Sequence, residues 1–215
     1  MAELAPAGYV ILGLDIIKYS QKSLRDQKLA QETVDRCFNW AIKEKQPEDD
    51  AQAPHWVDAG DGGYALFRWA EVDVLEVLKD FYKRLNRENA NITEENYKVL
   101  VRAAIHKDQV IVWDAEIAGR QVRKFTGHAI NNCARLMSGM IKEHDAQVVC
   151  SRSVLDAIMV MDKLASATRL KDIKDKHGIE HEVWNLHVGT LLGVKPIKRE
   201  LHGEPTMRVY PGPSR

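Results

Sequence analysis

The hydrophobic pattern at the start of the chain predicts a buried strand followed by a long amphipathic helix. Residues 10–14 form a short apolar run that ends at Asp15, which is typical of a strand buried in a sheet. Ser20 is a candidate N-cap for the helix, which is expected to extend to about Lys45. The apolar residues that recur there at helical spacing are Ala30, Val34, Cys37, Phe38, Ala41 and Ile42.

The pattern that follows predicts a hairpin and a second helix. Residues 55–59 and 64–69 are expected to form strands on either side of Gly60-Asp61-Gly62-Gly63, a sequence that tolerates the positive φ angles of tight turns. Apolar residues from Val72 to Leu85 return to helical spacing. Residues 86–96 are polar, which predicts a connecting segment.

The second half of the chain predicts shorter elements. Strands are expected at 99–105 and 110–113, joined by a tight polar link at 106–109, and a polar basic stretch follows at 119–124. A helix at 127–142 and a strand at 148–150 come next, and then a short helix from Ser151 or Ser153 through Met161. The chain is expected to close with a hairpin of 169–173 and 182–186 and an irregular tail after Val188.

The element order β-α-β-β-α-β matches a ferredoxin-like core, here with C-terminal additions. The sequence therefore predicts an α/β protein of the α+β kind. We expect an antiparallel-rich sheet with the helices on one face. The other face would be open to a partner subunit or a substrate.

Composition narrows the classes of function. The 215 residues fit one domain, and the 31 basic and 31 acidic residues cancel, so no global field favours nucleic acid or an anionic membrane. The chain lacks a run of about 18 apolar residues and a recognisable secretion signal at its start. Its three scattered cysteines suit a reducing compartment. We expect a cytoplasmic protein that binds neither nucleic acid nor membrane.

Two aspartates are candidate metal ligands. Asp15 follows the first strand, where its carboxylate can hold a divalent cation and the backbone N–H groups of the next turn can receive phosphates. Asp61 lies at the tip of the predicted hairpin. If the two strands are adjacent, both carboxylates meet at one edge of the sheet and can hold two metal ions. Alternatively, Asp15 caps a helix and Asp61 belongs to an ordinary Asp-Gly turn.

Asn131 and Arg135 are candidates for substrate contacts. They are four residues apart on one predicted helix, so their side chains share a face that is offset from its apolar stripe. An amide and a guanidinium on that face suit a ribose oxygen and an α-phosphate. The simpler interpretation is a solvated helix face.

Five segments together resemble the catalytic domain of class III nucleotide cyclases, from residue 9 to about residue 188. They occur in the order and roughly the spacing of that family. The segments are Leu14-Asp15-Ile16-Ile17-Lys18-Tyr19-Ser20, Ala59-Gly60-Asp61-Gly62-Gly63-Tyr64, Arg102-Ala103-Ala104-Ile105-His106, Gly127-His128-Ala129-Ile130-Asn131-Asn132-Cys133-Ala134-Arg135-Leu136 and Leu170-Lys171-Asp172-Ile173-Lys174. The resemblance implies a catalytic domain over residues 1–188 and a C-terminal tail over residues 189–215.

The resemblance also implies roles for individual residues. Asp15, Asp61 and the Ile16 carbonyl would bind two divalent cations, Mn²⁺ or Mg²⁺, and Asn131 would orient the ribose while Arg135 stabilises the transition state. The turn after the first strand, Ile17, Lys18 and Tyr19, would contact phosphates. A lysine, either Lys171 or Lys174, would contact the terminal phosphates. Family members form composite sites between two catalytic domains, which implies a homodimer with two sites. The reaction would be in-line attack of the ribose 3′-hydroxyl on the α-phosphorus with loss of pyrophosphate.

The positions that match the base-reading residues of purine cyclases differ here. They are Val57, three residues before Gly60, and Lys124, seven residues before Asn131. A lysine ammonium only donates hydrogen bonds and so suits a pyrimidine carbonyl, which favours UTP, with CTP next. In this respect the chain resembles the bacterial Pycsar anti-phage cyclases, whose cyclic UMP or cyclic CMP acts on a separate effector protein.

Three other interpretations remain. The chain could be a divergent adenylate cyclase, or a cyclase-like module that binds a nucleotide or a partner without turnover. A diguanylate cyclase would need a Gly-Gly-Asp/Glu-Glu-Phe turn, whereas this turn is Gly60-Asp61-Gly62-Gly63-Tyr64. Retention of both aspartates with Asn131 and Arg135 favours an active enzyme.

Overall fold

The computed structural model describes residues 5–45, 53–140, 148–161, 166–170, 172–174, 178–187 and 207–208. The strands are β1 (Ala7–Ile16), β2 (His55–Asp58), β3 (Gly62–Phe67), β4 (Val101–Ile117), β5 (Arg120–Thr126), β6 (Val148–Cys150), β7 (Ser166–Arg169), β8 (Ile173–Lys174), β9 (Glu180–His181), β10 (Trp184–Leu186) and β11 (Met207–Arg208). The helices are α1 (Leu24–Lys43), α2 (Glu71–Ala90), α3 (Ala129–Ser138) and α4 (Arg152–Val160), with short 3-10 helices η1 (Tyr19–Gln21) and η3 (Glu95–Tyr97).

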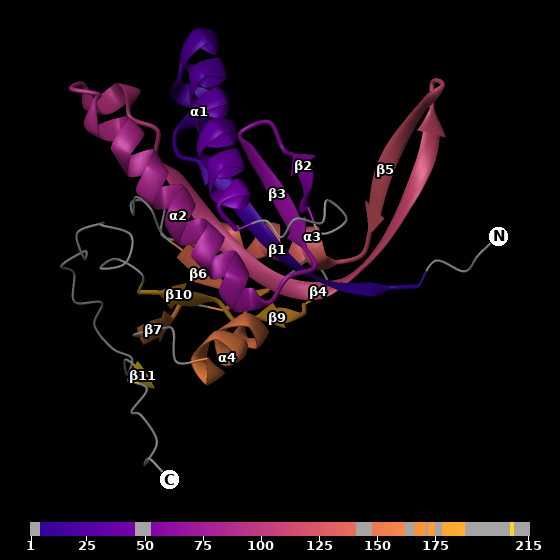
Figure 1. Ribbon diagram of the computed structural model, residues 1–215. Coiled ribbons are helices and arrows are strands. Elements are labelled where there is room, and N and C mark those ends of the chain that lie inside the picture. The colour runs from indigo at the N-terminus through magenta and orange to yellow at the C-terminus, as the bar shows by residue number, and fades with distance from the viewer. Residues whose placement is uncertain are drawn as a thin grey trace.

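A mixed sheet forms the centre of the fold (Figure 1). Its strand order is β11-β7-β10-β6-β4-β1-β3-β2, and β5 pairs with the outer half of β4. Strand β1 lies between β3 and β4 and is antiparallel to both, whereas β4 and β6 are parallel. The predicted α+β class and antiparallel-rich sheet are confirmed.

Helices cover both faces of this sheet, which corrects the expectation that they share one face. Helices α1, α2 and α4 pack with one set of β1 side chains, which includes Leu12 and Leu14. Helix α3 packs on the opposite face with the alternate set, which includes Tyr9 and Ile11. Because β1 is apolar on both sides, both faces need a cover. Gly13 lets α3 approach closely, since a Cβ there would lie 2.9 Å from Met137 Cε.

Strand β4 is continuous through the segment for which we predicted a tight link. Residues 106–109 stay in register with β1, from Ile11 opposite His106 to Gly8 opposite Gln109. The polar basic stretch at 119–124 lies mostly in β5, which pairs with β4 as a two-stranded ribbon that projects from the body (Figure 1). The ribbon turns at Ala118 and Gly119, which both have positive φ angles (51° and 75°).

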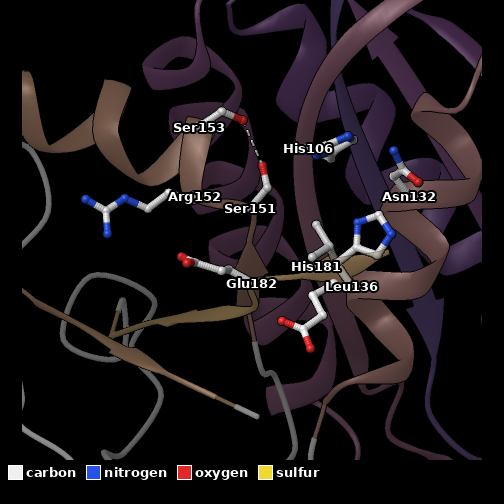
Figure 2. Close-up of a pocket in the computed structure, with 9 residues that line it drawn as sticks. His106, Asn132, Leu136, Ser151, Arg152, Ser153, His181 and Glu182 are labelled. Carbon is white, nitrogen blue, oxygen red and sulfur yellow. Dashed lines mark hydrogen bonds between the residues drawn. The ribbon is translucent and has the colours of Figure 1, made fainter. Parts of the chain in front are cut away.

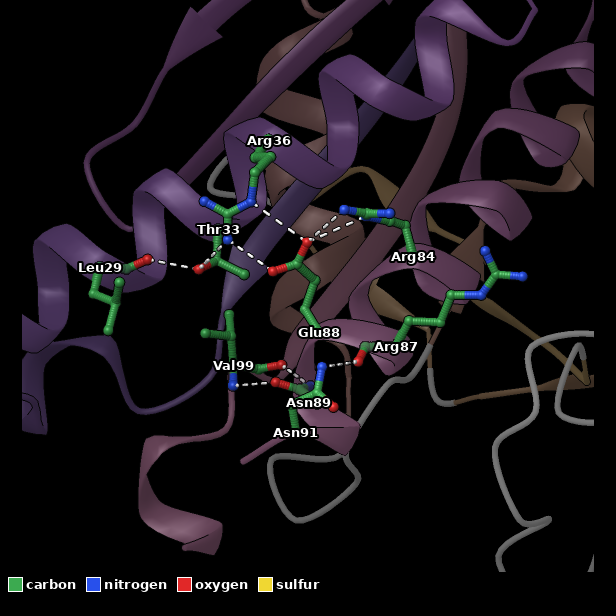
Figure 3. A network of polar contacts seen from close by, with 9 residues as sticks. All are labelled: Leu29, Thr33, Arg36, Arg84, Arg87, Glu88, Asn89, Asn91 and Val99. Atoms are coloured by element: carbon green, nitrogen blue, oxygen red, sulfur yellow. Dashed lines mark hydrogen bonds and ion pairs between the residues drawn. The ribbon is translucent and has the colours of Figure 1, made fainter. Parts of the chain in front are cut away.

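Helix α2 is longer than predicted, because its last turn is held to the segment just before β4. The buried Asn89 donates from Nδ2 to the Val99 carbonyl at 2.8 Å, and its Oδ1 accepts from the Val99 N–H at 3.0 Å (Figure 3). One residue earlier, Glu88 accepts hydrogen bonds from Arg36 of α1 and Arg84 of α2. These contacts keep residues 86–90 helical, although the sequence suggested a connection there.

Other boundaries also differ from the predictions. Helix α1 is capped by Ser23, whose hydroxyl accepts from the Asp26 N–H at 3.2 Å, while Ser20 lies in η1. Helix α3 ends at Ser138, and residues 141 and 142, which we predicted to be helical, lie outside the described residues.

The C-terminal part adds short strands to the sheet. Strands β7 and β10 pair as the closing hairpin, but β8 and β9 form a separate two-stranded sheet between them. Strand β11 pairs with β7 inside the tail that we predicted to be irregular. The domain boundary near residue 188 stays a prediction. In the described part of the chain, no helix is long and apolar enough to cross a membrane.

Candidate active site

The strand pairing brings Asp15 and Asp61 together. Asp15 pairs with Gly62, the residue that follows Asp61, and the Ile16 N–H donates to the Asp61 carbonyl at 2.8 Å. The two aspartates, far apart in sequence, therefore lie at the same end of the β1–β3 pair. This is the proximity that the sequence predicted.

The turn that carries Asp61 is fixed by backbone contacts. The Ala59 N–H donates to the Gly62 carbonyl at 3.1 Å, and the Asp58 carboxylate accepts from the Gly60 N–H at 2.8 Å. Gln31 of α1 donates to the Gly60 carbonyl. Gly62 has a φ of 156°, and a Cβ there would lie 2.0 Å from the Leu14 carbonyl oxygen. Only glycine permits this approach of the turn to β1.

Both carboxylates lie near the hydroxyl group of Tyr64. Burial raises the pKa of Tyr64 to about 12, with further contributions from Cys133, Asp61 and Asp15. Tyr64 lies beside Gly13, on the α3 face of the sheet. Strand alternation places Asp15, two residues after Gly13, on that same face.

The Asp15 carboxylate is held by Arg102, the residue opposite it on β4. The Arg102 Nε donates to Asp15 Oδ2 at 2.9 Å, and its Nη2 donates to the same oxygen. The two side chains are 19% and 21% exposed, so this ion pair is partly shielded from water. Sequence reasoning gave Arg102 no separate role, because only the β1–β4 register reveals the pair.

The donor set fits a divalent cation bound through oxygen. In the described residues the Asp61 carboxylate has no hydrogen-bond or ion-pair partner, and the bonds from Arg102 engage only Oδ2 of Asp15. Carboxylate oxygens are preferred by Mg²⁺ and Mn²⁺. The described residues contain no group of three or more His, Cys, Asp or Glu side chains that could hold a metal. A cation here would therefore complete its shell with the Ile16 carbonyl, substrate oxygens or water.

The turn after β1 offers fewer phosphate donors than expected. The Ile17 N–H already donates to the Leu100 carbonyl at 2.9 Å, so it is not available to a phosphate in this arrangement. Lys18 has a left-handed conformation with φ 57° and leads into η1. Its own N–H and that of Tyr19 remain as the candidate donors.

Asn131 and Arg135 occupy the outer part of α3. The side of this helix that faces the sheet carries Cys133, whereas Asn131 is exposed. The Arg135 Nη1 donates to Asn132 Oδ1 at 2.7 Å. This hydrogen bond stays within α3.

The two candidate base-reading residues lie on different strands. Val57 on β2 is half-buried and packs against the buried side chains between α3 and the sheet. Phe125 on β5 packs against the same side chains. The Phe125 ring lies 5.7 Å from the His55 ring, and strand alternation directs Lys124 to the opposite face of β5. In the described part of the chain, the Lys124 ammonium has no hydrogen bond or ion pair, so it is available to a ligand.

The choice between the two candidate phosphate-binding lysines stays open. Lys174 on β8 is exposed and forms an ion pair with Glu180 at 3.0 Å. Lys171 lies outside the described residues.

Solved structures with this architecture are numerous, although no protein-family model and no curated protein matches the chain. The guanylyl cyclase Cya2 superposes with a TM-score of 0.68 at 15% identity, over 85% of this chain and 92% of that chain. The adenylyl cyclase CyaB from P. aeruginosa gives 0.64 at 12% identity, over 86% and 95%. A guanylyl cyclase domain from Blastocladiella emersonii, described as a non-canonical dimer, gives a TM-score of 0.61 at 13% identity, over 84% of this chain and 96% of that chain.

The fold is that of a nucleotide cyclase catalytic domain. It explains why Asp15 and Asp61 lie at adjacent strand ends, because β1 and β3 are neighbours at the centre of this sheet. In the described part of the chain, α3 packs on the face of the main sheet opposite to α1, α2 and α4.

Behind α3 the cyclase fold contains a polar cavity of about 280 Å³ (Figure 2). His106 of β4 and Asn132 of α3 line it, together with the start of α4 and strand β9. Both ring nitrogens of His106 are buried without a hydrogen bond, and Nε2 lies 3.7 Å from Asp108 Oδ2. Burial lowers the pKa of His106, an effect that Asp108 opposes and His181 adds to.

Proposed function

We propose that this protein is a nucleotide cyclase, which converts a nucleoside triphosphate to the 3′,5′-cyclic monophosphate and pyrophosphate. The observation that carries the proposal is the convergence of Asp15 and Asp61 at the end of β1, next to a turn with free backbone donors. Two carboxylates beside a phosphate-binding turn are the arrangement that metal-assisted phosphoryl transfer requires. Similar solved structures are described as adenylyl and guanylyl cyclases.

In this proposal Asp15 and Asp61 hold two divalent cations, Mn²⁺ or Mg²⁺, with the Ile16 carbonyl as a further ligand. Bound cations would supply acidity to the ribose 3′-hydroxyl and neutralise the triphosphate. Arg102 keeps the Asp15 carboxylate oriented by two hydrogen bonds to one oxygen, which leaves the other oxygen for ligation. The Lys18 and Tyr19 N–H groups would hold the terminal phosphates.

A homodimer would complete each site. Asn131 would hold the ribose and Arg135 would stabilise the charge that develops on the α-phosphate, both from the partner of the chain that supplies the aspartates. The exposure of Asn131 on α3 supports a composite site. A similar guanylyl cyclase domain is described as a non-canonical dimer, which supports pairing of such domains but not this particular arrangement.

The finer part of the proposal concerns the base. Val57 cannot form the polar contacts of a purine-reading Lys or Glu, and Lys124 can only donate. Uracil presents two carbonyl acceptors and cytosine one, so we propose UTP as the substrate, with CTP next. The role of the cyclic product in anti-phage signalling to a separate effector stays an expectation from the resemblance.

The experiment incubates the purified protein with Mn²⁺ and each of the four ribonucleoside triphosphates, and mass spectrometry identifies the products. Cyclic UMP should dominate, and Asp61→Asn should lower turnover by about 100-fold or more while its melting temperature is unchanged. The matched control Asp73→Asn, on an exposed position of α2, should keep full activity. Absence of any cyclic product would refute the enzyme, and comparable turnover of ATP would refute only the base assignment.

A second arm tests the composite site. Asp61→Asn and Arg135→Ala should each be inactive alone. When they are mixed, heterodimers carry one intact site, so random pairing should recover about one quarter of the wild-type activity. If the mixture stays inactive although subunits exchange, all four residues act within one chain and the homodimer proposal fails.

A further inference from the structure

Arg135 does not extend freely from α3. Its Nη1 donates to Asn132 Oδ1 at 2.7 Å, one turn earlier on the same helix. The other end of the Asn132 amide, Nδ2, donates to Asp108 Oδ2 at 3.4 Å. A single amide therefore joins the guanidinium on α3 to a carboxylate on β4.

The orientation of this amide follows from the charges on its two sides. A carbonyl oxygen facing the guanidinium and an amino group facing the carboxylate both give attractive contacts. The flipped amide would set an NH₂ against Arg135 and an oxygen against Asp108, and both contacts would be lost. An asparagine thus suits position 132 because it accepts on one side and donates on the other.

Asp108 is itself well fixed. Its Oδ1 accepts from the Gln109 N–H at 2.7 Å, and this part of β4 is paired with β1. The hydrogen bonds from Arg135 through Asn132 to Asp108 therefore end on a strand of the central sheet. Side chains locked in this way hold a functional group in place more accurately than a free side chain on a helix surface.

We propose that Asn132 is a positioning residue for Arg135, which sets the guanidinium at the α-phosphate and is anchored by Asp108. This inference rests on the proposed cyclase function. It adds a residue to the site that was given no role there and connects the site to the wall of the α3 cavity (Figure 2).

The kinetic test compares two changes in the hydrogen bonds between Arg135, Asn132 and Asp108 with one control variant. Asn132→Leu keeps the size of the side chain and favours helix while it removes both polar ends. Asn132→Asp with Asp108→Asn exchanges the carboxylate and the amide, so that every donor still faces an acceptor and the net charge is unchanged. Asn39→Leu, at an exposed position of α1, is the matched control.

We expect Asn132→Leu to lower kcat by roughly 10- to 100-fold and to change KM by less than about twofold, because Arg135 acts mainly in the transition state. The exchanged double variant should recover most of kcat, and Asn39→Leu should match the wild type. A helix-surface bond with only a structural role would lower the melting temperature of Asn132→Leu and leave its kcat unchanged. Unchanged kcat in Asn132→Leu would overturn the proposal.

A second measurement does not depend on turnover. Hydrogen-bonded guanidinium groups rotate slowly about the Nε–Cζ bond, which ¹⁵N-edited NMR detects as separate Nη signals, and Arg135→Lys assigns the signal. The Arg135 signals should be resolved in the wild type and averaged in Asn132→Leu. Equal averaging in both proteins would overturn the proposal. If no triphosphate is turned over but the NMR difference is present, the cyclase function fails and the positioning of Arg135 stands.

Discussion

Gly62 is the residue on which the approach of the two aspartates depends most directly. A Cβ at this position would lie 2.0 Å from the Leu14 carbonyl oxygen, whereas Cβ contacts under 3.0 Å are essentially never seen. The obstacle is backbone of the central strand, so the turn and not β1 must move. Gly60, two residues earlier in the same turn, also has a positive φ of 84°, but a Cβ there would meet nothing within 4 Å. Comparing Gly60→Ala with Gly62→Ala therefore separates the effect of backbone strain, which both variants have, from the effect of the close approach, which only Gly62→Ala has.

The magnitudes can be worked from this geometry. Gly60→Ala places an L-residue in a left-handed conformation, which costs about 1–2 kcal/mol. Gly62→Ala adds a retreat of about 1 Å, which carries the 2.8 Å bond from the Ile16 N–H to the Asp61 carbonyl beyond hydrogen-bonding range. With about 1 kcal/mol for that bond and a similar loss in the adjacent ladder, the total is about 3–4 kcal/mol.

The assay is urea unfolding of both variants, followed by activity with Mn²⁺ and UTP under conditions where each remains folded. The midpoint of Gly62→Ala should lie about 1 M below that of Gly60→Ala, for a slope near 2 kcal/mol/M. Its folded fraction should still be roughly 100-fold less active, because a displacement of about 1 Å misplaces the Asp61 carboxylate. Equal midpoints for the two variants, or full activity of Gly62→Ala, would show that the close approach does not set the site.

Two further predictions concern stability. Asn89→Ala should lower the free energy of unfolding by about 2–4 kcal/mol, because it removes two buried hydrogen bonds to Val99, whereas Asn91→Ala, which loses one exposed bond, should change it by less than about 0.5 kcal/mol. Stability should also fall as the pH drops below about 6.5, because the lowered pKa of His106 means that the unfolded chain takes up its proton first. His106→Gln should reduce the difference in unfolding free energy between about pH 7.5 and about pH 5, and an unchanged difference would contradict the role of this imidazole.

The strongly patterned elements could be predicted from the sequence. Strand β1 and helix α1 have a clear apolar period, and the glycine-rich turn between β2 and β3 marks a hairpin. The pattern fails where a strand is not covered by other elements. Strand β5 is polar because the ribbon that it forms with β4 projects from the body, so neither side selects an apolar run. Residues 106–109 of β4 are similarly polar, and they are strand only because β1 pairs with them.

The sequence predicts which strands carry the candidate site, but it does not predict the side-chain partners within the site. The proximity of Asp15 and Asp61 needs only that two central strands are neighbours, which the order of elements implies. The partners that hold these side chains are different. Arg102 is opposite Asp15 through the register of β1 with β4, and Asn132 meets Arg135 through side-chain orientation on α3. Neither contact follows from the hydrophobic pattern, which specifies faces and does not specify cross-strand pairs.

The two candidate metal ligands are supported in different ways, and this decides where the site is vulnerable. Asp15 belongs to a strand paired on both sides, follows the buried Leu14, and has its carboxylate held by Arg102. Asp61 is exposed in a turn, and its position depends on backbone bonds and on the absence of a side chain at Gly62. A change in the sheet would therefore unfold the protein before it displaced Asp15. A change in the turn can displace Asp61 in a chain that remains folded, so loss of activity without loss of fold should arise mainly from the β2–β3 turn.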